Sequence, residues 1–178
     1  MQKRESNILF LLRSLKHENS VRILVLYAQN GFCNLLFTSA DYDLHDLLLN
    51  PPPPAYFQEI RNVFDAVRGL ASGLHYLHNF HLLAIAEGSE EITKQGYRHD
   101  IKPRNILVRG NILILVDFGR SRLKDVDEDT KTNWKNSLPT YGAPESHYPV
   151  TLAALEIGQA FDIWSFGCVL SEIATFVI

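Results

Sequence analysis

Two short apolar runs on either side of a glycine-containing turn constrain the fold more than any other part of the sequence. Residues 105–108 read NILV, residues 112–116 read ILILV, and Arg109-Gly110-Asn111 separates them. Short runs of this kind that flank such a turn are typical of a β-hairpin. A hairpin of this length brings its two ends together. We therefore expect the residues just before the first strand and just after the second to be neighbours in the folded chain.

Both ends of this hairpin carry side chains that suit chemistry on a phosphate. Asp100, Lys102 and Asn105 lie on the short loop that leads into it, and Asp117-Phe118-Gly119 lies at its far end. Phosphoryl transfer needs a base or positioning group at the attacking hydroxyl, cations on the phosphates, and ligands that hold those cations. Mg²⁺ prefers carboxylate and amide oxygens. The spacing therefore predicts a base, a cation and two metal ligands, Asn105 and Asp117, in one place.

A second hairpin is predicted nearer the start of the chain. Residues 21–28 and 32–38 are apolar runs, and Gln29-Asn30-Gly31 joins them. Asn-Gly between apolar runs is a strong hairpin signal, because both residues tolerate the positive φ of a tight turn. Apolar residues at helical spacing predict a helix over residues 4–16, and residues 41–49 predict a short helix.

The clearest helical pattern covers residues 56–80, shortly after four prolines at 51–54. The pattern predicts one apolar stripe along the helix. The residues of this stripe are Ile60, Val63, Phe64, Val67, Leu70, Leu74 and Leu77. The prolines are either a polyproline ligand for a partner or a stiff loop between helices. We favour the loop because amphipathic segments flank it closely.

Three histidines lie at three-residue intervals near the end of this helix: His75, His78 and His81. A metal site would use such spacing, but no acidic or thiol ligand is nearby to complete it. We therefore favour ordinary surface histidines. Residues 83–96 look like a surface insertion, and residues 119–160 like mostly irregular chain.

Composition excludes several classes of protein. The chain has 178 residues, 46% of them hydrophobic, and a formal net charge of −3, which is ordinary globular composition. The slight acidity gives no reason to expect a nucleic-acid partner. Its two cysteines form neither a disulfide framework nor a zinc motif, and no apolar run reaches the roughly 18 residues of a membrane span. We expect a protein of the cytoplasm, with the nucleus as the alternative, with no nucleic-acid or membrane partner and an oligomeric state that the sequence leaves open.

Four segments, in the same order, resemble motifs of the protein kinases. Residues 100–105, DIKPRN, resemble the catalytic loop, and Asp117-Phe118-Gly119 resembles the metal-binding triplet. Ala143-Pro144-Glu145 resembles the end of the activation segment, and residues 162–167, DIWSFG, resemble the start of the central buried helix. Each segment alone is a weak signal, but the ordered set is specific. Residues 81–96 also resemble loops in divergent kinase-like proteins of filamentous fungi.

The resemblance implies an α+β, two-lobed kinase-like fold. Residues 1–40 would be part of the small lobe and hinge, with one helix and a β-hairpin. Residues 41–178 would be part of the mainly helical large lobe. Within it, the catalytic loop is expected at 98–105, the activation segment at 117–145 and the central helix from 162.

The resemblance also implies a role for each matching residue, with ATP and Mg²⁺ as cofactors. Asp100 would accept or orient the substrate hydroxyl proton, and Lys102 would steady the transferred phosphate. Asn105 and Asp117 would hold Mg²⁺. The other implied site residues are Leu107 beneath the adenine, the strand edge Phe37, Thr38, Ser39 and Ala40 beside it, Phe118 and Gly119 of the triplet, Glu145 at the end of the activation segment, and Asp162, which would brace the catalytic loop.

The substrate class follows from two features of the same resemblance. A lysine two places after the base resembles the serine/threonine kinases rather than the tyrosine kinases. Small-molecule phosphotransferases share the acid, asparagine and second acid. They are not expected to carry the Ala-Pro-Glu and Asp-x-Trp-Ser-x-Gly elements. A protein substrate is therefore expected.

The sequence departs from the family pattern at both ends. Met1 falls close to the third element of a kinase, so the glycine-rich loop and the lysine-bearing strand do not occur in these residues. The last helix, residues 162–178, is apolar on almost every side and should be buried all round, but we expect that whatever should cover one of its sides is absent from these residues. We therefore expect the isolated chain to be weakly active or inactive. The alternatives are a non-catalytic kinase-like binding module and a truncated product that folds poorly.

The residues before Asp100 also depart from the family, which usually places histidine before arginine. Here Arg98 precedes His99, and an imidazole is a weaker, pH-dependent partner for phosphate than a guanidinium. Our hypothesis is that activity does not depend strongly on phosphorylation of the activation segment.

This hypothesis predicts the behaviour of one multiple variant. The variant replaces every candidate phosphate acceptor of the activation segment with alanine. We expect the full-length protein with these changes to retain most of its kinase activity. The acceptors are Thr130, Thr132, Ser137 and Thr140. Activity is measured as phosphate incorporated into a protein substrate, and its abolition in the quadruple variant would contradict the hypothesis.

Overall fold

The computed structural model describes residues 16–29, 32–79, 81–84, 92–97, 100–116, 122–125, 140–144 and 159–177. The chain forms two compact units. The first comprises Met1–Leu77 and Pro103–Val116, and the second comprises His78–Lys102 and Asp117–Ile178. Among the described residues, the first unit contains helices and two antiparallel sheets, and the second contains one long helix and one antiparallel sheet, which agrees with the predicted α+β class. The helix predicted over residues 4–16 lies outside the described residues, apart from Lys16.

The hairpin predicted over residues 105–116 is confirmed. Strand β6 (Ile106–Arg109) pairs antiparallel with β7 (Ile112–Leu115). Gly110 has a φ of 58° in the turn, which a residue without a side chain adopts without steric cost. The hairpin forms a large part of the core, because the side chains of Ile106 and Val108 are fully buried.

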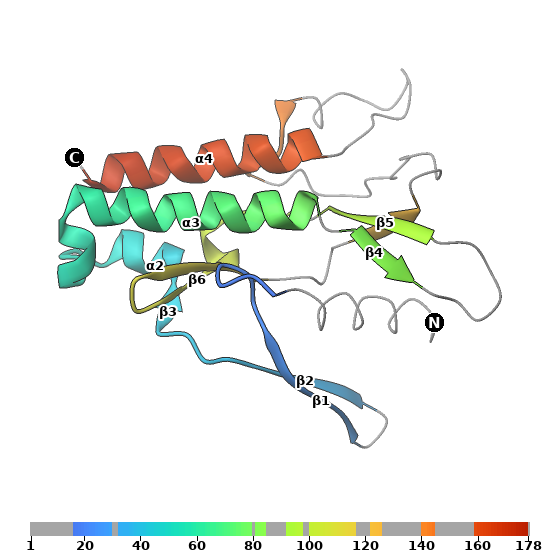
Figure 1. Cartoon of the computed structure of the whole chain (residues 1–178). Helices are drawn as coiled ribbons and strands as arrows, with labels where there is room; N and C mark the ends of the chain where they lie inside the picture. The colour runs from blue at the N-terminus through green and yellow to red at the C-terminus, as the bar shows by residue number, and fades with distance from the viewer. Residues whose placement is uncertain are drawn as a thin grey trace. The chain divides into compact units, whose positions relative to one another are not determined.

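The second predicted hairpin is also confirmed, with shorter strands. Strand β1 (Ile23–Gln29) pairs antiparallel with β2 (Phe32–Phe37) in a two-stranded sheet that extends away from α3 within the first unit (Figure 1). The predicted turn at residues 30–31 lies outside the described residues. Large apolar side chains on both strands are exposed to solvent. They are Leu24, Val25, Tyr27, Leu35, Leu36 and Phe37.

The short helix predicted at residues 41–49 begins later than predicted. Tyr42 and Asp43 form strand β3 (Tyr42–Asp43), which pairs with β6, so helix α2 runs only over Leu44–Leu49. The carboxylate of Asp43 accepts a hydrogen bond of 2.8 Å from the backbone N–H of Asp46. Such a bond satisfies a donor that the first helical turn leaves free. The proline segment then leads into a 3₁₀ turn, η1 (Ala55–Gln58).

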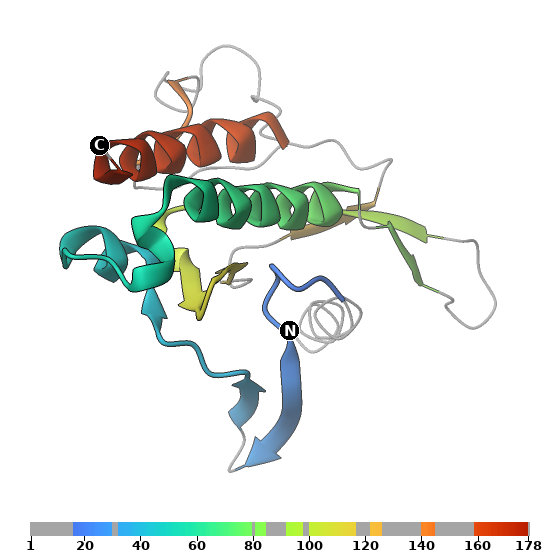
Figure 2. The same ribbon diagram turned by 60° about the vertical axis from the view of Figure 1, so that its left-hand side comes forward.

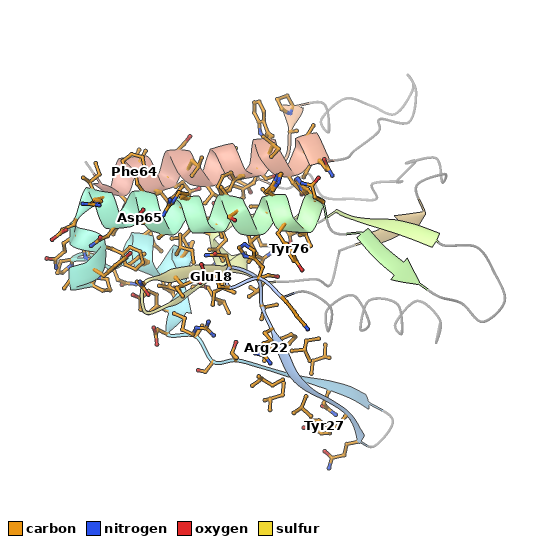
Figure 3. The ribbon with its side chains drawn as sticks, viewed as in Figure 1. Glu18, Arg22, Tyr27, Phe64, Asp65 and Tyr76 are labelled. Atoms are coloured by element: carbon orange, nitrogen blue, oxygen red, sulfur yellow. The ribbon has the colours of Figure 1, made fainter. Side chains whose placement is uncertain are left out.

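The long predicted helix is confirmed as α3 (Ile60–His78). Four residues of the predicted apolar stripe are buried: Val63, Leu70, Leu74 and Leu77. Two others of the stripe are exposed to solvent: Ile60 is 60% exposed and Phe64 is 67% exposed. Figure 3 shows Phe64 near the start of α3. The apolar pattern therefore predicted the helix but overestimated the width of its buried face.

The segment from Lys16 to Val21 joins α3 to the β6–β7 hairpin within the first unit. Asn19 is 3% exposed, and its side-chain amide donates a 2.8 Å hydrogen bond to the carbonyl oxygen of Leu113. The backbone carbonyl of Asn19 accepts from Leu115 N–H at 2.9 Å. Asn19 also lies directly against two glycines of α3. A Cβ atom at Gly69 would be 2.7 Å from Asn19 Nδ2, and one at Gly73 would be 3.0 Å from Asn19 O.

His17 adds a contact from the same segment to the same helix. Its Nε2 lies 3.2 Å from Ser72 Oγ, and its ring lies 5.3 Å from the ring of Tyr76. Figure 3 shows Tyr76 on α3 next to the segment that carries Glu18. The loop therefore contacts successive turns of α3.

The second unit contains strands that the sequence did not predict. Strands β4 (His81–Ala84), β5 (Ile92–Tyr97) and β8 (Arg122–Asp125) form one antiparallel sheet in the order β4-β5-β8. Residues 83–84 and 92–96 of the predicted surface insertion lie in paired strands, which the sequence did not predict. Strands this short are stabilised by pairing, and β8 comes from a segment far along the chain from β5.

Helix α4 (Gln159–Val177) confirms the predicted last helix, with a start three residues earlier. One face is buried, and its buried residues include Phe161, Val169 and Ile173. Ile163 and Trp164 are 55% and 48% exposed. Part of the surface of α4 is therefore exposed in the residues that the structure describes. α4 is drawn in red in Figures 1 and 2.

Within the described part of the chain, neither long helix combines the length and hydrophobicity that crossing a membrane requires.

The close approach of Asn19 to α3 predicts opposite effects of the same substitution at two helical glycines. Gly69→Ala should lower the free energy of unfolding by about 1–3 kcal/mol, because the new methyl group displaces a buried, hydrogen-bonded amide. Gly167→Ala in α4 is the matched control, since a Cβ there meets no atom within 4 Å. It should raise stability by up to about 1 kcal/mol through helix propensity. Urea unfolding followed by circular dichroism measures both, and equal stabilisation would contradict the tight contact.

Candidate active site

The loop before the 3₁₀ turn η2 (Pro103–Asn105) brings together two of the predicted catalytic side chains. Lys102 Nζ lies 2.9 Å from Asp100 Oδ2 and 3.1 Å from Oδ1. The side chain of Asp100 is 10% exposed and that of Lys102 is 36% exposed. The ammonium therefore contacts both oxygens of a largely buried carboxylate. An ammonium has three N–H donors, so this arrangement leaves one of them for a further anion.

Alternating burial fixes the direction of the loop's side chains. Ile101 and Pro103 are almost fully buried, whereas Lys102 and Arg104 reach solvent. The buried Ile101 and Pro103 hold the backbone in place, so the side chains of Lys102 and Arg104 are directed outward. Pro103 opens the 3₁₀ turn η2 (Pro103–Asn105), which leads straight into β6.

Asn105 lies at the base of the β6–β7 hairpin. Its backbone carbonyl accepts a 3.0 Å hydrogen bond from Val116 N–H, which extends the pairing beyond the two strands. Asp117 follows Val116 in the sequence, but it lies outside the described residues, as do Phe118 and Gly119. The predicted sharing of Mg²⁺ by Asn105 and Asp117 therefore stays a prediction. Asn105 belongs to the first unit and Asp100 to the second.

The residue that follows the predicted strand edge is hydrogen-bonded to the hairpin that carries Leu107. Asp41, which follows Ala40, donates its backbone N–H to the carbonyl of Val108 at 2.9 Å, and Val108 follows Leu107. The Asp41 carboxylate also accepts a 2.7 Å hydrogen bond from Gly110 N–H. These two bonds attach the end of the predicted strand edge, Phe37 to Ala40, to the hairpin that carries Leu107. Their contact with a nucleotide stays a prediction.

Tyr42 follows this edge in β3. Partial burial, and secondly the negative charge of Asp41, raise the pKa of the Tyr42 phenol above its ordinary value. The phenol is therefore neutral at physiological pH.

Asp162 and His78 form a buried pair in the second unit. His78 Nε2 lies 2.9 Å from Asp162 Oδ2, and the two side chains are 7% and 0% exposed. The interpretation of His78 as a surface histidine is therefore wrong. Its position was a usable signal, because it is four residues after the buried Leu74 and lies on the same helical face. Gln159, at the start of α4, donates a 2.8 Å hydrogen bond to the His78 carbonyl.

The chain before Glu145 is anchored to α4. Ala143 is fully buried and packs with Phe161. Ser165 Oγ donates a 2.7 Å hydrogen bond to the carbonyl of Tyr141, and the Tyr141 hydroxyl donates one of 2.6 Å to Glu172. Sequence reasoning missed these anchoring roles of Tyr141 and Ser165. Glu145 itself lies outside the described residues.

One group among the described residues has the composition of a cation site. The ligand atoms of Asp43, His45 and Asp46 lie within 4.8 Å of one another. Asp43 is already used as the N-cap of α2, and Asp46 is exposed. His45 Nε2 lies 3.3 Å from Arg104, a cation. We therefore interpret the group as the start of a helix rather than as a metal site.

Comparison with known proteins decides the family. The model of the protein kinase domain family matches residues 3–177. The chain belongs to the protein kinase family. The kinase-like α+β fold expected from the motifs is thus confirmed, whereas the lobe boundary at residue 40 stays a prediction.

The curated relatives are kinases of limited identity. A probable serine/threonine-protein kinase of Arabidopsis thaliana is 29% identical over 93% of this chain and 26% of its own length. A probable cell division protein kinase of Encephalitozoon cuniculi is 25% identical over 93% of this chain and 53% of its own length. Human cyclin-dependent kinase-like 5 is 27% identical over 92% of this chain and 15% of its own length. The chain therefore spans about half or less of each of these relatives.

The buried pair predicts a marked loss of stability when its imidazole is removed. His78→Ala should lower the free energy of unfolding by about 2–3 kcal/mol, because the carboxylate of Asp162 loses a buried hydrogen-bond partner. His75→Ala on the same helix is the control. His75 is exposed, so its change should stay within about 0.5 kcal/mol. Chemical denaturation of both variants measures the difference, and similar losses would argue against the pair.

Proposed function

We infer that this chain is part of a serine/threonine kinase domain. The whole domain, rather than this chain in isolation, transfers the γ-phosphoryl group of ATP to a hydroxyl of a protein substrate, with Mg²⁺ as cofactor. The observation that carries the proposal is the Asp100–Lys102 pair, with Nζ 2.9 Å and 3.1 Å from the two carboxylate oxygens. It lies on the loop that the family motif assigns to catalysis. A chance pairing of an acid and a cation does not account for the ordered motifs around it.

The two side chains divide the work at the attacking hydroxyl. Asp100 accepts the hydrogen bond of the substrate hydroxyl and orients its oxygen toward the γ-phosphorus. The new bond forms between that oxygen and phosphorus, the bond from phosphorus to the departing ADP oxygen breaks, and the hydroxyl proton passes to the carboxylate. Lys102 keeps one N–H for an oxygen of the transferred group, where a positive charge stabilises the transition state.

Asn105 and Asp117 offer the donor types that a hard cation selects, an amide oxygen and a carboxylate. Bound Mg²⁺ would neutralise charge on the phosphates. The hydrogen bond between the backbones of Asn105 and Val116 supports this proposal, because Val116 immediately precedes Asp117 in the sequence.

The choice of serine or threonine as acceptor rests on Lys102, two places after the base, and on the names of the relatives. One relative is named a probable serine/threonine-protein kinase. Retention of Asp100, Lys102, Asn105 and Asp117 together favours catalysis over a non-catalytic kinase-like module, because a decayed site should lose some of these residues.

Substitution of the proposed base tests the proposal. Asp100→Asn in the natural protein should lower kcat about 10²–10⁴-fold, because the amide cannot accept the proton. Asp117→Ala should also abolish most transfer. Asp65→Asn is the matched control, since Asp65 lies half exposed on α3 and pairs with Arg68. Transfer of labelled phosphate from MgATP to a generic protein substrate, followed by phosphoamino acid analysis, is the measurement.

Three outcomes would overturn parts of the proposal. Full activity in Asp100→Asn would remove Asp100 as the base. Labelled phosphotyrosine alone would remove the serine/threonine assignment. Loss of activity in Asp65→Asn equal to that in Asp100→Asn would show that the assay reports stability rather than catalysis.

A further inference from the structure

A cavity of about 670 Å³ lies in the first unit, on the segment that leads into β1. Its walls come from this segment, from the start of β1, from Thr38 and from the β6–β7 hairpin. Three of its lining residues are cations: Lys16, Arg22 and Arg109. Figure 3 shows Arg22 at the base of β1, in the same part of the unit as Glu18. The volume falls within the roughly 300–1,000 Å³ of known ligand sites.

The charge of this cavity is unbalanced. Glu18 is the one carboxylate among its lining residues. Within the described part of the chain, none of the three cations forms an ion pair with a carboxylate. Elsewhere in the described residues, Arg68 and Lys102 both have a carboxylate partner within 3.2 Å. Among the described residues, the lining therefore gathers three cations against one carboxylate.

The elements that carry these cations are fixed to one another. Val21 N–H donates a 3.0 Å hydrogen bond to Leu115 O, and Leu115 N–H donates one of 2.9 Å to Asn19 O. These bonds join the segment with Lys16 and Arg22 to strand β7, next to the strand that ends at Arg109. A ligand therefore meets a largely formed site, which lowers the entropy cost of binding.

The cavity also has an apolar part. Ile114 is 3% exposed and forms part of the wall, while Leu24 is 51% exposed at its edge. A small inorganic anion would contact the cations and leave this apolar surface unused. A peptide with acidic groups beside an apolar side chain would use both, because guanidinium groups bind carboxylate or phosphate in a bidentate manner.

We propose that this cavity binds an acidic peptide segment of a partner protein that carries an apolar side chain next to its negative charges. The cavity borders the predicted nucleotide site at Thr38, but Phe37, Ser39, Ala40 and Leu107 of that site do not line it. The proposal goes beyond phosphoryl transfer and does not depend on it, since its readout is binding. The acidic groups are either carboxylates or phosphorylated hydroxyls, and the experiment distinguishes them.

The test uses fluorescein-labelled peptides and fluorescence anisotropy with the 178-residue chain. One peptide has Asp and Glu on both sides of a leucine, and a second has phosphoserines in place of the acids. In the controls, Asn and Gln replace the acids, or alanine replaces the leucine. We expect an acidic peptide to bind, the neutral peptide to bind at least about tenfold more weakly, and added salt to reduce binding.

Variants of the chain locate the site. Arg22→Gln and Arg109→Gln should each weaken binding about three- to tenfold, since each removes a charge-assisted hydrogen bond at a partly exposed position. Leu24→Ser should weaken binding of the leucine peptide but not of the alanine peptide. Arg68→Gln is the control, because Arg68 is an exposed arginine of α3 that does not line the cavity. Melting curves check that each variant is folded. If Arg109→Gln unfolds, binding by Arg22→Gln alone tests the location of the site.

The remaining outcomes all overturn the proposal. Equal binding of acidic and neutral peptides would exclude charge recognition. Equal weakening by Arg68→Gln would show general attraction to positive charge rather than this cavity. Displacement of the peptide by millimolar inorganic phosphate, with no difference between the leucine and alanine peptides, would identify a small-anion site instead.

Discussion

The packing of Asn19 against α3 is the constraint on which the first unit depends. Its side-chain amide bonds to Leu113, its backbone carbonyl bonds to Leu115, and its side chain fills the space above Gly69 and Gly73. The bond from the buried side-chain nitrogen to Leu113 offsets part of the cost of removing that group from water, and it fixes the loop against the hairpin. The β6–β7 hairpin, which carries Leu107, is held to α3 by the same loop. The glycines permit the approach, because any side chain there would separate the two elements.

The loop of residues 100–104 shows how apolar residues position polar ones. Ile101 and Pro103 are buried, and between them Lys102 reaches back to the carboxylate of Asp100. A loop held only by its polar groups would exchange those contacts for water. Burial of alternate residues instead fixes the backbone, so that the acid and the lysine remain paired without a substrate. Such preorganisation is what phosphoryl transfer requires, since most of the catalysis is positioning and electrostatics.

Sequence reasoning succeeded where structure is local and failed where it depends on distant partners. Both hairpins followed from turn residues between apolar runs, and α3 followed from its periodicity. The strands β4, β5 and β8 carry no comparable local pattern and exist through their mutual pairing. Likewise Tyr42 and Asp43 joined a strand instead of α2 because β6 was available to pair with them. The Asp100–Lys102 pair was predictable, since the two are neighbours in sequence, whereas the partner of Asp162 lies 84 residues away.

Helix α4 organises the second unit through its first turns. Phe161 packs on Ala143, Asp162 pairs with His78, and Ser165 holds the carbonyl of Tyr141. The end of α3 and the chain just before Glu145 are thereby attached to the same short stretch of one helix. An acid with no exposure is tolerated there because an imidazole lies 2.9 Å from it, and an isolated buried charge would be strongly disfavoured. The apolar composition of this helix therefore accounts for its burial, but its few polar residues determine which segments it holds. A purely apolar helix of the same shape would bury equal area without selecting these partners.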